Sequence, residues 1–342
     1  MSTPTRFPSF RNHRLSLALA WLLVSCATVN PAANTPPPPT PLTLQLPWTH
    51  DYEFTSFYAA EQNGYFASQN LAVTFKTGGF QAGTFINPID IVLSGKADFG
   101  VMDAYNLILA RAKGQPVVAV AVLFQRSPSS IISLRSSNIS RPQDLIGKRV
   151  AITAGGVTWT YTAMLATQGI TLEQMEVVPR KAAGIAPLLN GEVDAMTGWV
   201  INEGIQVQEA GQDANFIVMG DYGVDAYQHV IFTTEKMIAE HPETVERLLR
   251  AVLAGLQDTL AHPDETATLI LRYNNTLDLG GQRRRLQAAL PFINPAGSTP
   301  LAMQAEGWAA TQQTMLDQGA LAKPIKLEDA YTRAFLQKIT GP

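Results

Sequence analysis

Short stretches of alternating or continuous apolar residues recur along the chain and predict β-strands. Residues 42–46 read Leu-Thr-Leu-Gln-Leu, the two-residue period of a strand with one buried face. Residues 71–75 have the same character, and residues 99–101 predict a shorter strand. Residues 117–124 are continuously apolar and rich in β-branched side chains, which is typical of a buried parallel strand.

Helical spacing of apolar residues separates these strands. The predicted helices span residues 55–68, 89–93, 106–112 and 161–167. The second half adds predicted strands at 149–153 and 176–178. Strands that alternate with helices predict an α/β fold.

One local pattern occurs twice. Residues 93–98 read Leu-Ser-Gly-Lys-Ala-Asp, and residues 189–194 read Leu-Asn-Gly-Glu-Val-Asp. In each, a helix would end at glycine, which readily takes the left-handed conformation, and a short strand would follow. Two similar α/β lobes would give this spacing, although helix–glycine–strand joints are also common in unrelated folds.

The C-terminal third predicts helices. Pro242 and Pro263 stand in the first turns of two of them, each after a histidine. We therefore interpret His241 and His262 as helix-start residues. The first of these helices carries an apolar stripe made of Val245, Leu248, Leu249, Val252, Leu253, Leu256 and Leu260.

The N-terminus has the pattern of an export signal. Three arginines precede the apolar run 15–24, which is too short to span a bilayer. The run ends Leu-Val-Ser-Cys at residues 23–26, which resembles the lipobox of bacterial lipoproteins and predicts lipidation of Cys26. A buried N-terminal helix that ends in an incidental cysteine is the alternative.

Residues 26–41 predict an extended stalk. They include four consecutive prolines and favour polyproline II over helix or central strand. We expect a signal peptide at 1–25, a proline-rich stalk at 26–41, and an exported body tethered to the cell membrane by acyl chains.

Composition excludes several classes of protein. The 342 residues are 46% hydrophobic and 15% charged, which is unlike a disordered chain. Lys and Arg number 25 against 28 Asp and Glu, a net charge of −3 that argues against a general nucleic-acid binder. The single cysteine excludes an internal disulfide and a multi-cysteine zinc site. The length suggests two domains.

Catalytic motifs are missing from the sequence. It contains no HExxH, no GxSxG, no GxGxxG after a strand and no P-loop. Gly155 and Gly156 follow a predicted strand and precede a helix, so their N–H groups could face a ligand oxygen, although a plain tight turn explains them equally well. We therefore expect no catalytic residues, no metal and no cofactor.

Aromatic residues gather where predicted strands end. In open α/β sheets, ligands bind beyond the carboxyl ends of the strands. Three of the five tryptophans fall in such predicted loops, with a few acids and amides. Stacking walls with polar edges suit a flat heterocycle, although each aromatic could instead belong to the core. The candidate ligand-binding residues are Trp48, Tyr52, Phe54, Asp103, Trp159, Tyr161, Trp199, Asn202 and Glu203.

Several short motifs occur in the order found in one protein family. Asn63–Phe66 followed by Leu71–Val73 resembles the "GYF…GL-V" signature of periplasmic-type substrate-binding proteins. Residues 94–101, 145–150, 198–203, 221–227 and 233–235 are similar to the branch that binds thiamine precursors and riboflavin. The resemblance extends over residues 43–338. It adds Tyr222 to the candidate binding residues and implies that Asn202 and Glu203 are polar ligand contacts.

The resemblance implies a two-lobed type II binding-protein fold, with a mostly parallel sheet flanked by helices in each lobe. We expect one lobe from residues 42–130 and 225–342 and the other from 131–224. Closure would occur about a hinge near 128–135 and 222–228.

The implied function is capture of a planar vitamin for an ABC permease by a monomeric protein. Pyrimidine binders of this branch usually have Asp before the tryptophan and Pro-Asn after it, whereas this chain has Pro47 and Thr49-His50. That difference and the many aromatic residues favour riboflavin over a thiamine pyrimidine. An extracellular sensor is a further alternative. An enzyme is not expected, because the related fungal enzymes carry a cysteine-rich segment that this chain lacks.

Overall fold

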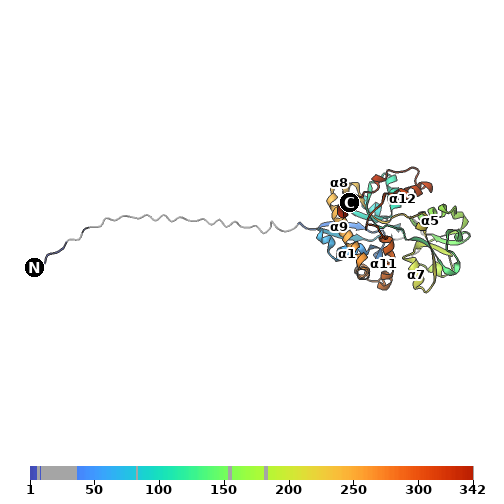
Figure 1. The fold of residues 1–342 in the computed structure, drawn as a ribbon, viewed down its shortest axis with the longest axis horizontal. Coiled ribbons are helices and arrows are strands. Elements are labelled where there is room, and N and C mark those ends of the chain that lie inside the picture. Colours follow the sequence, from blue (N-terminus) through green and yellow to red (C-terminus); the bar gives the residue numbers. More distant parts are fainter. Residues whose placement is uncertain (6–7, 9–36, 82–83, 153–155, 181–183, 342) are drawn as a thin grey trace. The chain divides into compact units, whose positions relative to one another are not determined.

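The described strands assemble into two five-stranded sheets (Figure 1) and a small two-stranded sheet of β3 (Phe80–Gln81) and β4 (Thr84–Phe85). The computed structural model describes residues 1–5, 8, 37–81, 84–152, 156–180 and 184–341. Both five-stranded sheets belong to the compact unit that begins at Pro39. Cys26, most of the predicted signal peptide and most of the stalk lie outside the described residues. Within the described ranges, we find no helix with the length and apolar character that crossing a membrane requires.

The first sheet has the order β2-β1-β5-β12-β6. Its strands are β1 (Thr40–Gln45), β2 (Leu71–Lys76), β5 (Phe99–Met102), β6 (Val117–Phe124) and β12 (Gln228–Thr234). β1 runs parallel to β2 and β5, whereas β12 runs antiparallel to both β5 and β6. Every residue of β6 is buried, as its apolar run predicts. Its neighbour β12 is antiparallel to it, but β6 runs in the same direction as β5, because β12 is antiparallel to both.

The second sheet has the order β11-β7-β10-β8-β9. Its strands are β7 (Ser129–Leu134), β8 (Arg149–Ile152), β9 (Glu176–Pro179), β10 (Ala195–Trp199) and β11 (Ala214–Val218). β8 pairs in parallel with β9 and β10, and β7 pairs antiparallel with β10 and β11. Both sheets are therefore mixed. In each, four of the five strands run in one direction, in agreement with the expected mostly parallel sheets, and one returning antiparallel strand is inserted among them.

The chain passes between the sheets twice. The first sheet uses strands from residues 40–124 and 228–234, and the second uses strands from 129–218. The two connections are residues 125–128 and 219–227, the second of which contains a 3-10 turn at Met219–Tyr222. The division into lobes at 42–130 with 225–342, and 131–224, remains our prediction.

Helices cover both sheets. Those that accompany the first sheet include α1, α8 and α9, and α5 and α7 accompany the second (Figure 1). The helices are α1 (Thr55–Gln62), α2 (Tyr65–Ser68), α3 (Pro88–Leu93), α4 (Ala104–Ala112), α5 (Gly156–Thr167), α6 (Ala186–Leu189), α7 (Glu203–Glu209), α8 (Glu235–Glu240), α9 (Pro242–Ala261), α10 (Pro263–Ala267), α11 (Leu279–Ile293), α12 (Ala305–Asp317) and α13 (Ala334–Thr340).

Two predicted helix bounds are corrected. The helix expected at 55–68 is divided into α1 and α2, because Gly64 takes a left-handed φ of 77° between them. The helix expected at 161–167 already begins at Gly156, so Trp159 lies on a helix and not in a loop. Gly155 lies outside the described residues.

The repeated pattern corresponds to one structural joint in each sheet. Gly95 and Gly191 have φ of 72° and 69°. Asp98 follows the first glycine; its carboxylate accepts the N–H of Thr43 on β1 at 2.7 Å, and its own N–H donates to the Thr43 carbonyl at 2.9 Å. Asp194 makes the same two bonds with Arg149 on β8, at 2.8 and 2.9 Å. The prediction that the pattern marks two similar halves agrees with this shared geometry.

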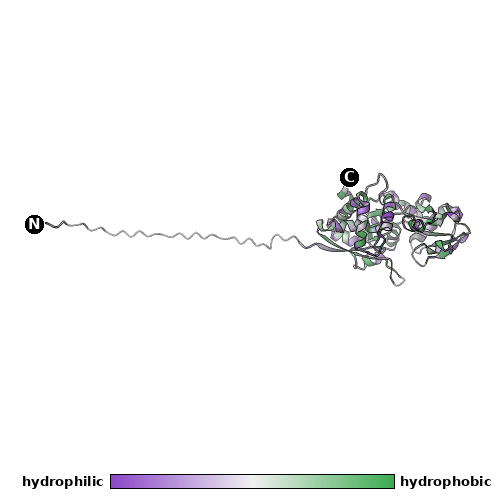
Figure 2. Ribbon diagram, turned by 90° about the horizontal axis from the view of Figure 1, so that it is seen from below, coloured by the Kyte–Doolittle hydropathy of each residue, from purple (hydrophilic) through white to green (hydrophobic). Residues whose placement is uncertain are grey.

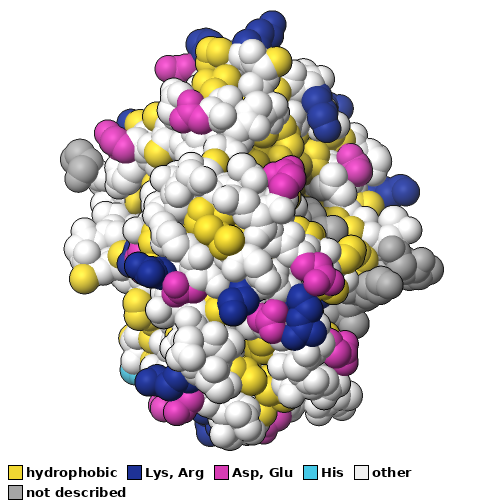
Figure 3. All heavy atoms as spheres, turned by 90° about the vertical axis from the view of Figure 1, so that its right-hand side faces the viewer, with side chains coloured by type: hydrophobic (Ala, Val, Ile, Leu, Met, Phe, Trp, Pro, Cys, Tyr) yellow, Lys and Arg dark blue, Asp and Glu magenta, His cyan; other side chains and the backbone are white. Residues whose placement is uncertain are grey.

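Buried apolar side chains form the core between helices and sheets. Hydrophobic residues are spread over both the helices and the strands (Figure 2). The predicted stripe of α9 is buried at Val245, Leu248, Leu249 and Val252, where it packs on α1. On the face shown in Figure 3, acidic and basic side chains are interspersed, as expected for a chain with a small net charge.

Candidate ligand-binding site

The carboxyl ends of strands from both sheets meet through aromatic side chains. Trp199, the last residue of β10, packs against Phe124 of β6 and His229 of β12, with ring centroids 5.4 and 5.2 Å apart. Phe54 contacts the same imidazole at 5.3 Å. Residues from three strands and the loop after β1 thus form one aromatic cluster that joins the two sheets.

A second aromatic contact also joins the sheets. Trp159 of α5 stacks on Tyr105 of α4 with centroids 4.4 Å apart and an interplanar angle of 21°. Trp159 is buried, and its indole N–H has no hydrogen-bond partner among the described residues. A flat ring could replace either member of this stack, because offset-stacked aromatic pairs need only a planar π-surface.

Trp48 occupies the loop between β1 and the turn at Tyr52. Its backbone carbonyl accepts the N–H of Gly78 at 3.0 Å, and its ring lies against Gly79 and edge-on to Phe80. A Cβ on Gly78 would stand 2.5 Å from the Leu46 carbonyl oxygen, so only glycine fits this close approach. Trp48 therefore lies at the same strand ends, but no ring contact joins it to Trp159 or Trp199 within the described chain.

A buried acid and an imidazole lie beneath the aromatic cluster. His229 Nε2 is 3.3 Å from Glu53 Oε2, and both side chains are at least nine-tenths buried. Burial lowers the pKa of His229 to about 3. Burial, reinforced by the Asp51 and Glu203 carboxylates, raises the pKa of Glu53 well above its ordinary value. Burial thus favours the neutral forms of both groups, and a neutral carboxyl can donate a hydrogen bond.

Two further acids have raised pKa values. Burial raises the pKa of Asp51 to about 7, although the N–H of Glu53 and the charge of Arg285 oppose the shift. Burial also raises the pKa of Asp103 to about 6, against the lowering effect of the His229 backbone N–H. Perturbed carboxyl groups gathered at strand ends are typical of functional sites.

Arg180 and Glu203 form a buried ion pair with an N–O distance of 2.9 Å. Arg180 also donates to the carbonyls of Thr197 and Gly184, each at 3.0 Å. The second oxygen of Glu203 accepts the N–H of Trp199 at 3.0 Å. Glu203 thus fixes the turn that carries Trp199, and both of its oxygens have partners in this structure.

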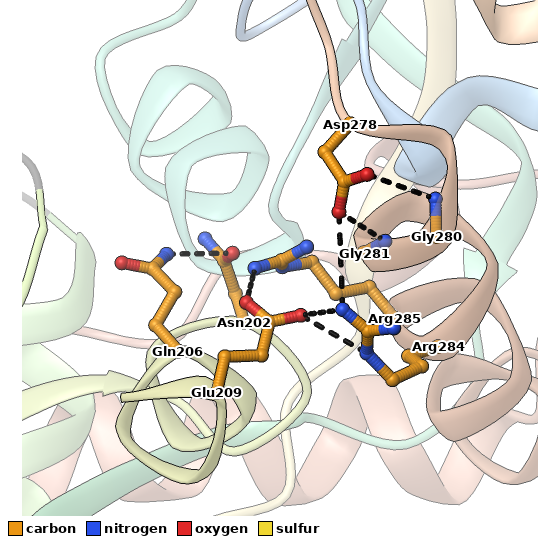
Figure 4. A network of polar contacts seen from close by, with 8 residues as sticks. All are labelled: Asn202, Gln206, Glu209, Asp278, Gly280, Gly281, Arg284 and Arg285. Carbon is orange, nitrogen blue, oxygen red and sulfur yellow. Dashed lines mark hydrogen bonds and ion pairs between the residues drawn. The ribbon is translucent and has the colours of Figure 1, made fainter. Parts of the chain in front are cut away.

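A cavity of about 340 Å³ lies beside this cluster. The loop at 49–52, helix α7 with the preceding Asn202, and the start of α11 line it. Glu209 of α7 crosses to α11, where it binds Arg284 and Arg285, each at 2.6 Å (Figure 4). The cavity volume lies within the range of about 300–1,000 Å³ common for small-molecule sites.

The structure brings together part of the predicted set. Tyr52 and Asn202 line the cavity; Phe54, Trp199 and Glu203 belong to or adjoin the aromatic cluster; Asp103 accepts from His229. Phe54 is fully buried, as is Tyr161, whose hydroxyl donates to the sulfur of Met175 at 2.8 Å. Tyr222 contributes its carbonyl to a bond from Thr167 at 2.9 Å. Neither Tyr161 nor Tyr222 contacts the cluster or the cavity in the described chain.

Sequence reasoning missed several residues. Glu53 directly follows the candidate residue Tyr52, and Tyr105 of α4 stands two residues after the candidate Asp103, so their positions in the sequence were available as a signal. His229, Arg180 and Arg285 come from segments with no local motif, and only the tertiary fold places them here. Within the described residues, His, Cys, Asp and Glu side chains form no group of three or more arranged to hold a metal ion.

These features can be compared with known proteins. The two mixed sheets with their helices have the fold of periplasmic binding proteins. The periplasmic aliphatic sulphonate binding protein SsuA of Escherichia coli superposes with a TM-score of 0.65. The match covers 86% of this chain and 92% of that one, at 15% sequence identity. The model of the family described as NMT1/THI5 like matches residues 51–266, and the chain belongs to this family.

Some relatives are named as binding proteins and others as enzymes. The riboflavin-binding protein RibY of Chloroflexus aurantiacus is 28% identical over 90% of each chain. A formylaminopyrimidine-binding protein of Halalkalibacterium halodurans is 27% identical over 93% of this chain and 97% of its own. A more distant relative from Legionella pneumophila, 22% identical over 74% of this chain and 80% of its own, is named 4-amino-5-hydroxymethyl-2-methylpyrimidine phosphate synthase.

Proposed function

We propose that this protein is the substrate-binding component of an ABC importer and that it captures a planar heterocyclic vitamin, with riboflavin as the favoured ligand. The aromatic cluster around Trp199 carries the proposal. It gathers rings from both sheets, includes the buried imidazole of His229, and lies next to the buried carboxyl of Glu53, whose pKa is raised by burial. Such a site offers stacking surfaces to a flat ring and neutral hydrogen-bonding groups to its edge.

Riboflavin suits the site better than a small pyrimidine. An isoalloxazine ring system has a larger stacking surface than a pyrimidine, and two aromatic contacts join the sheets, one around Trp199 and one between Tyr105 and Trp159. The names of the two full-length relatives support either ligand class. A thiamine pyrimidine such as formylaminopyrimidine is therefore the second candidate, and it would occupy a smaller part of the same site.

Binding would act through closure of the lobes. Trp159 and Trp199 belong to the second sheet and its helix, whereas Tyr105 and His229 belong to the first. A ligand that contacts both sets stabilises the closed arrangement, since it binds the open one with only half of its contacts. The connections near 128–135 and 222–228 would act as the hinge, and a membrane permease would recognise the closed form.

We further propose export, with lipidation at Cys26 and a stalk at 26–41 as the membrane tether of a monomeric protein. Capture is favoured over synthesis of a pyrimidine, because the chain's one cysteine stands at the lipobox-like motif. Formation of a pyrimidine phosphate by the purified protein would contradict this part of the proposal. A sensory role would show as a requirement for a receptor and not for a permease in uptake assays.

Fluorescence titration tests the ligand. Riboflavin, formylaminopyrimidine and hydroxymethylpyrimidine are titrated separately into the purified protein at micromolar concentration. We expect saturable quenching of flavin and tryptophan fluorescence with riboflavin. Trp199→Ala should weaken binding about tenfold or more, because a stacked ring and its buried area are lost. Val177→Ala on exposed β9 is the matched control and should leave the affinity unchanged. No saturation with any of the three ligands would refute the proposal.

A further inference from the structure

The cavity beside the aromatic cluster differs in chemistry from the cluster. Apart from Tyr52 and Leu277, the residues that line it carry amides, hydroxyls, an imidazole or charges. The same two loops serve both places: Glu53 of the cluster follows Tyr52 of the cavity, and the N–H of Asn202 donates to the Trp199 carbonyl at 3.0 Å. A polar extension of a ring bound at Trp199 would therefore reach the cavity.

Amide side chains line this cavity with hydrogen-bonding capacity left over. Gln206 donates through Nε2 to Oδ1 of Asn202 at 3.1 Å (Figure 4). Gln282 accepts the N–H of Tyr52 through Oε1 at 2.8 Å. Among the described residues, Oε1 of Gln206, Nδ2 of Asn202 and Nε2 of Gln282 have no further partner. The cavity thus presents an acceptor and two donors that are neutral at every pH.

The charges around the cavity disfavour an anionic ligand. Asp51, Glu209 and Asp278 place three carboxyl groups on its lining. Arg285 is already bound to Glu209, as is Arg284 just outside, and Asp278 accepts the N–H groups of Gly280 and Gly281. A phosphate would meet three acids, and Arg285, the one arginine on the described lining, already has its charge paired with Glu209. Hydroxyl groups would pair with amides and carboxylates alike.

We infer that this cavity is a polyol subsite, which binds the hydroxylated chain of the captured ring compound and discriminates against its phosphate ester. The inference rests on the proposed function and refines it: a ribityl chain fits this description, and a thiamine pyrimidine has no such chain. The subsite would select riboflavin over the smaller ligands.

A series of flavins distinguishes the contribution of the ring system to binding from that of the ribityl side chain. Riboflavin, lumiflavin, which has a methyl group in place of the ribityl chain, and flavin mononucleotide are titrated calorimetrically into the purified protein. We expect lumiflavin to bind about tenfold or more weakly than riboflavin, since two or more hydrogen bonds are lost. Flavin mononucleotide should also bind more weakly than riboflavin, and the difference should shrink at high salt.

Gln206→Ala tests the cavity directly. It should reduce the preference for riboflavin over lumiflavin about fivefold, because one hydrogen bond is lost with the first ligand only. Gln212→Ala, at an exposed position just after the same helix, is the matched control and should not change the preference. Thermal melts confirm that both variants are folded.

The possible results show whether the subsite alone fails or whether the proposed function fails with it. Equal affinities for riboflavin and lumiflavin, or an unchanged preference in Gln206→Ala, would overturn the subsite while the importer proposal stands. Binding of formylaminopyrimidine without any flavin would overturn the subsite and the choice of riboflavin together. Binding of flavin mononucleotide more tightly than riboflavin would contradict the assignment of a neutral polyol.

Discussion

His229 is the residue that contacts all the other rings of the aromatic cluster. Its ring contacts Phe54, Phe124 and Trp199, and its Nε2 faces Glu53. Its backbone has a φ of 49°, the left-handed region that non-glycine residues seldom occupy. Such strain concentrates at functional sites, where the surrounding contacts hold the residue in place.

Two substitutions distinguish the stability contributed by the imidazole contacts of His229 from the cost of its left-handed backbone. His229→Ala loses the ring contacts but keeps the unfavourable φ, so we expect it to lower the free energy of unfolding by about 2–4 kcal/mol. His229→Gly loses the same contacts but relieves the strain, so it should be less damaging than alanine by about 1 kcal/mol. Urea unfolding monitored by circular dichroism measures both. Alanine equal to or better than glycine would show that the left-handed backbone costs nothing here.

Residue-scale prediction from sequence was limited by what neighbouring positions can reveal. Loops rich in aromatic residues could be identified, and Trp199, Tyr52 and Asn202 were found in this way. Tyr161 could not be separated from a core residue, because helical spacing does not say which face of a helix meets the sheet. His229 and Arg285 contribute one side chain each from segments that have no pattern of their own.

At the scale of elements, the packing of α1 on α9 supports the loop that carries Trp48 and Glu53. Gly255 of α9 lies against α1, where a Cβ would stand 2.2 Å from the Ser56 carbonyl oxygen and 2.7 Å from the Ala60 nitrogen. The helix axes can approach this closely only because residue 255 has no side chain.

Gly255→Ala should therefore be destabilising despite the better helix propensity of alanine. Backbone atoms cannot move aside as a flexible side chain can, so we expect the free energy of unfolding to fall by about 3 kcal/mol. Gly280→Ala in the first turn of α11, where a Cβ meets nothing closer than 3.4 Å, is the control and should change stability by less than about 0.5 kcal/mol. Chemical denaturation distinguishes the two, and a neutral Gly255→Ala would contradict the close packing.

Some strands of the structure are predicted from the sequence and others are not. β1, β2, β5 and β6 are visible from alternation or from continuous apolar runs. β7, β11 and β12 are not predicted; each of them pairs only with antiparallel neighbours, as the predicted strand β6 also does. β7 has buried serines at 129, 130 and 133, where a binary pattern would place polar residues outside. Ser133 can be buried because its hydroxyl donates to the Ile139 carbonyl at 2.9 Å, a partner that local sequence does not reveal.

At the scale of the molecule, Glu209 connects the helix of one sheet to the helix of the other. It binds Arg284 and Arg285 of α11 through both oxygens, and the Arg285 side chain is only 11% exposed. Because α7 accompanies the second sheet and α11 packs beside the first, these ion pairs would favour the closed arrangement if the lobes close as we propose.

Glu209→Gln should shift the ligand-free protein toward open forms. The loss of two charge-assisted contacts, worth about 1 kcal/mol together at this partly exposed position, should raise the open population about fivefold. Small-angle X-ray scattering would detect this as a larger radius of gyration, and 1 M salt should produce part of the same change in the unmodified protein. Arg283→Gln, which removes a neighbouring cation of α11 that does not bind Glu209, is the control. An unchanged scattering curve for Glu209→Gln would show that the pairs do not hold the lobes together.

The order of strands also sets the order in which the sheets can be completed during synthesis. All strands of the second sheet lie between residues 129 and 218, so this sheet can assemble as soon as that stretch has left the ribosome. The first sheet must wait for β12, which fills the gap between β5 and β6. Until residue 234 has emerged, both of those strands expose unpaired edges, and a nascent chain that stalls in this interval presents the surfaces on which aggregation begins.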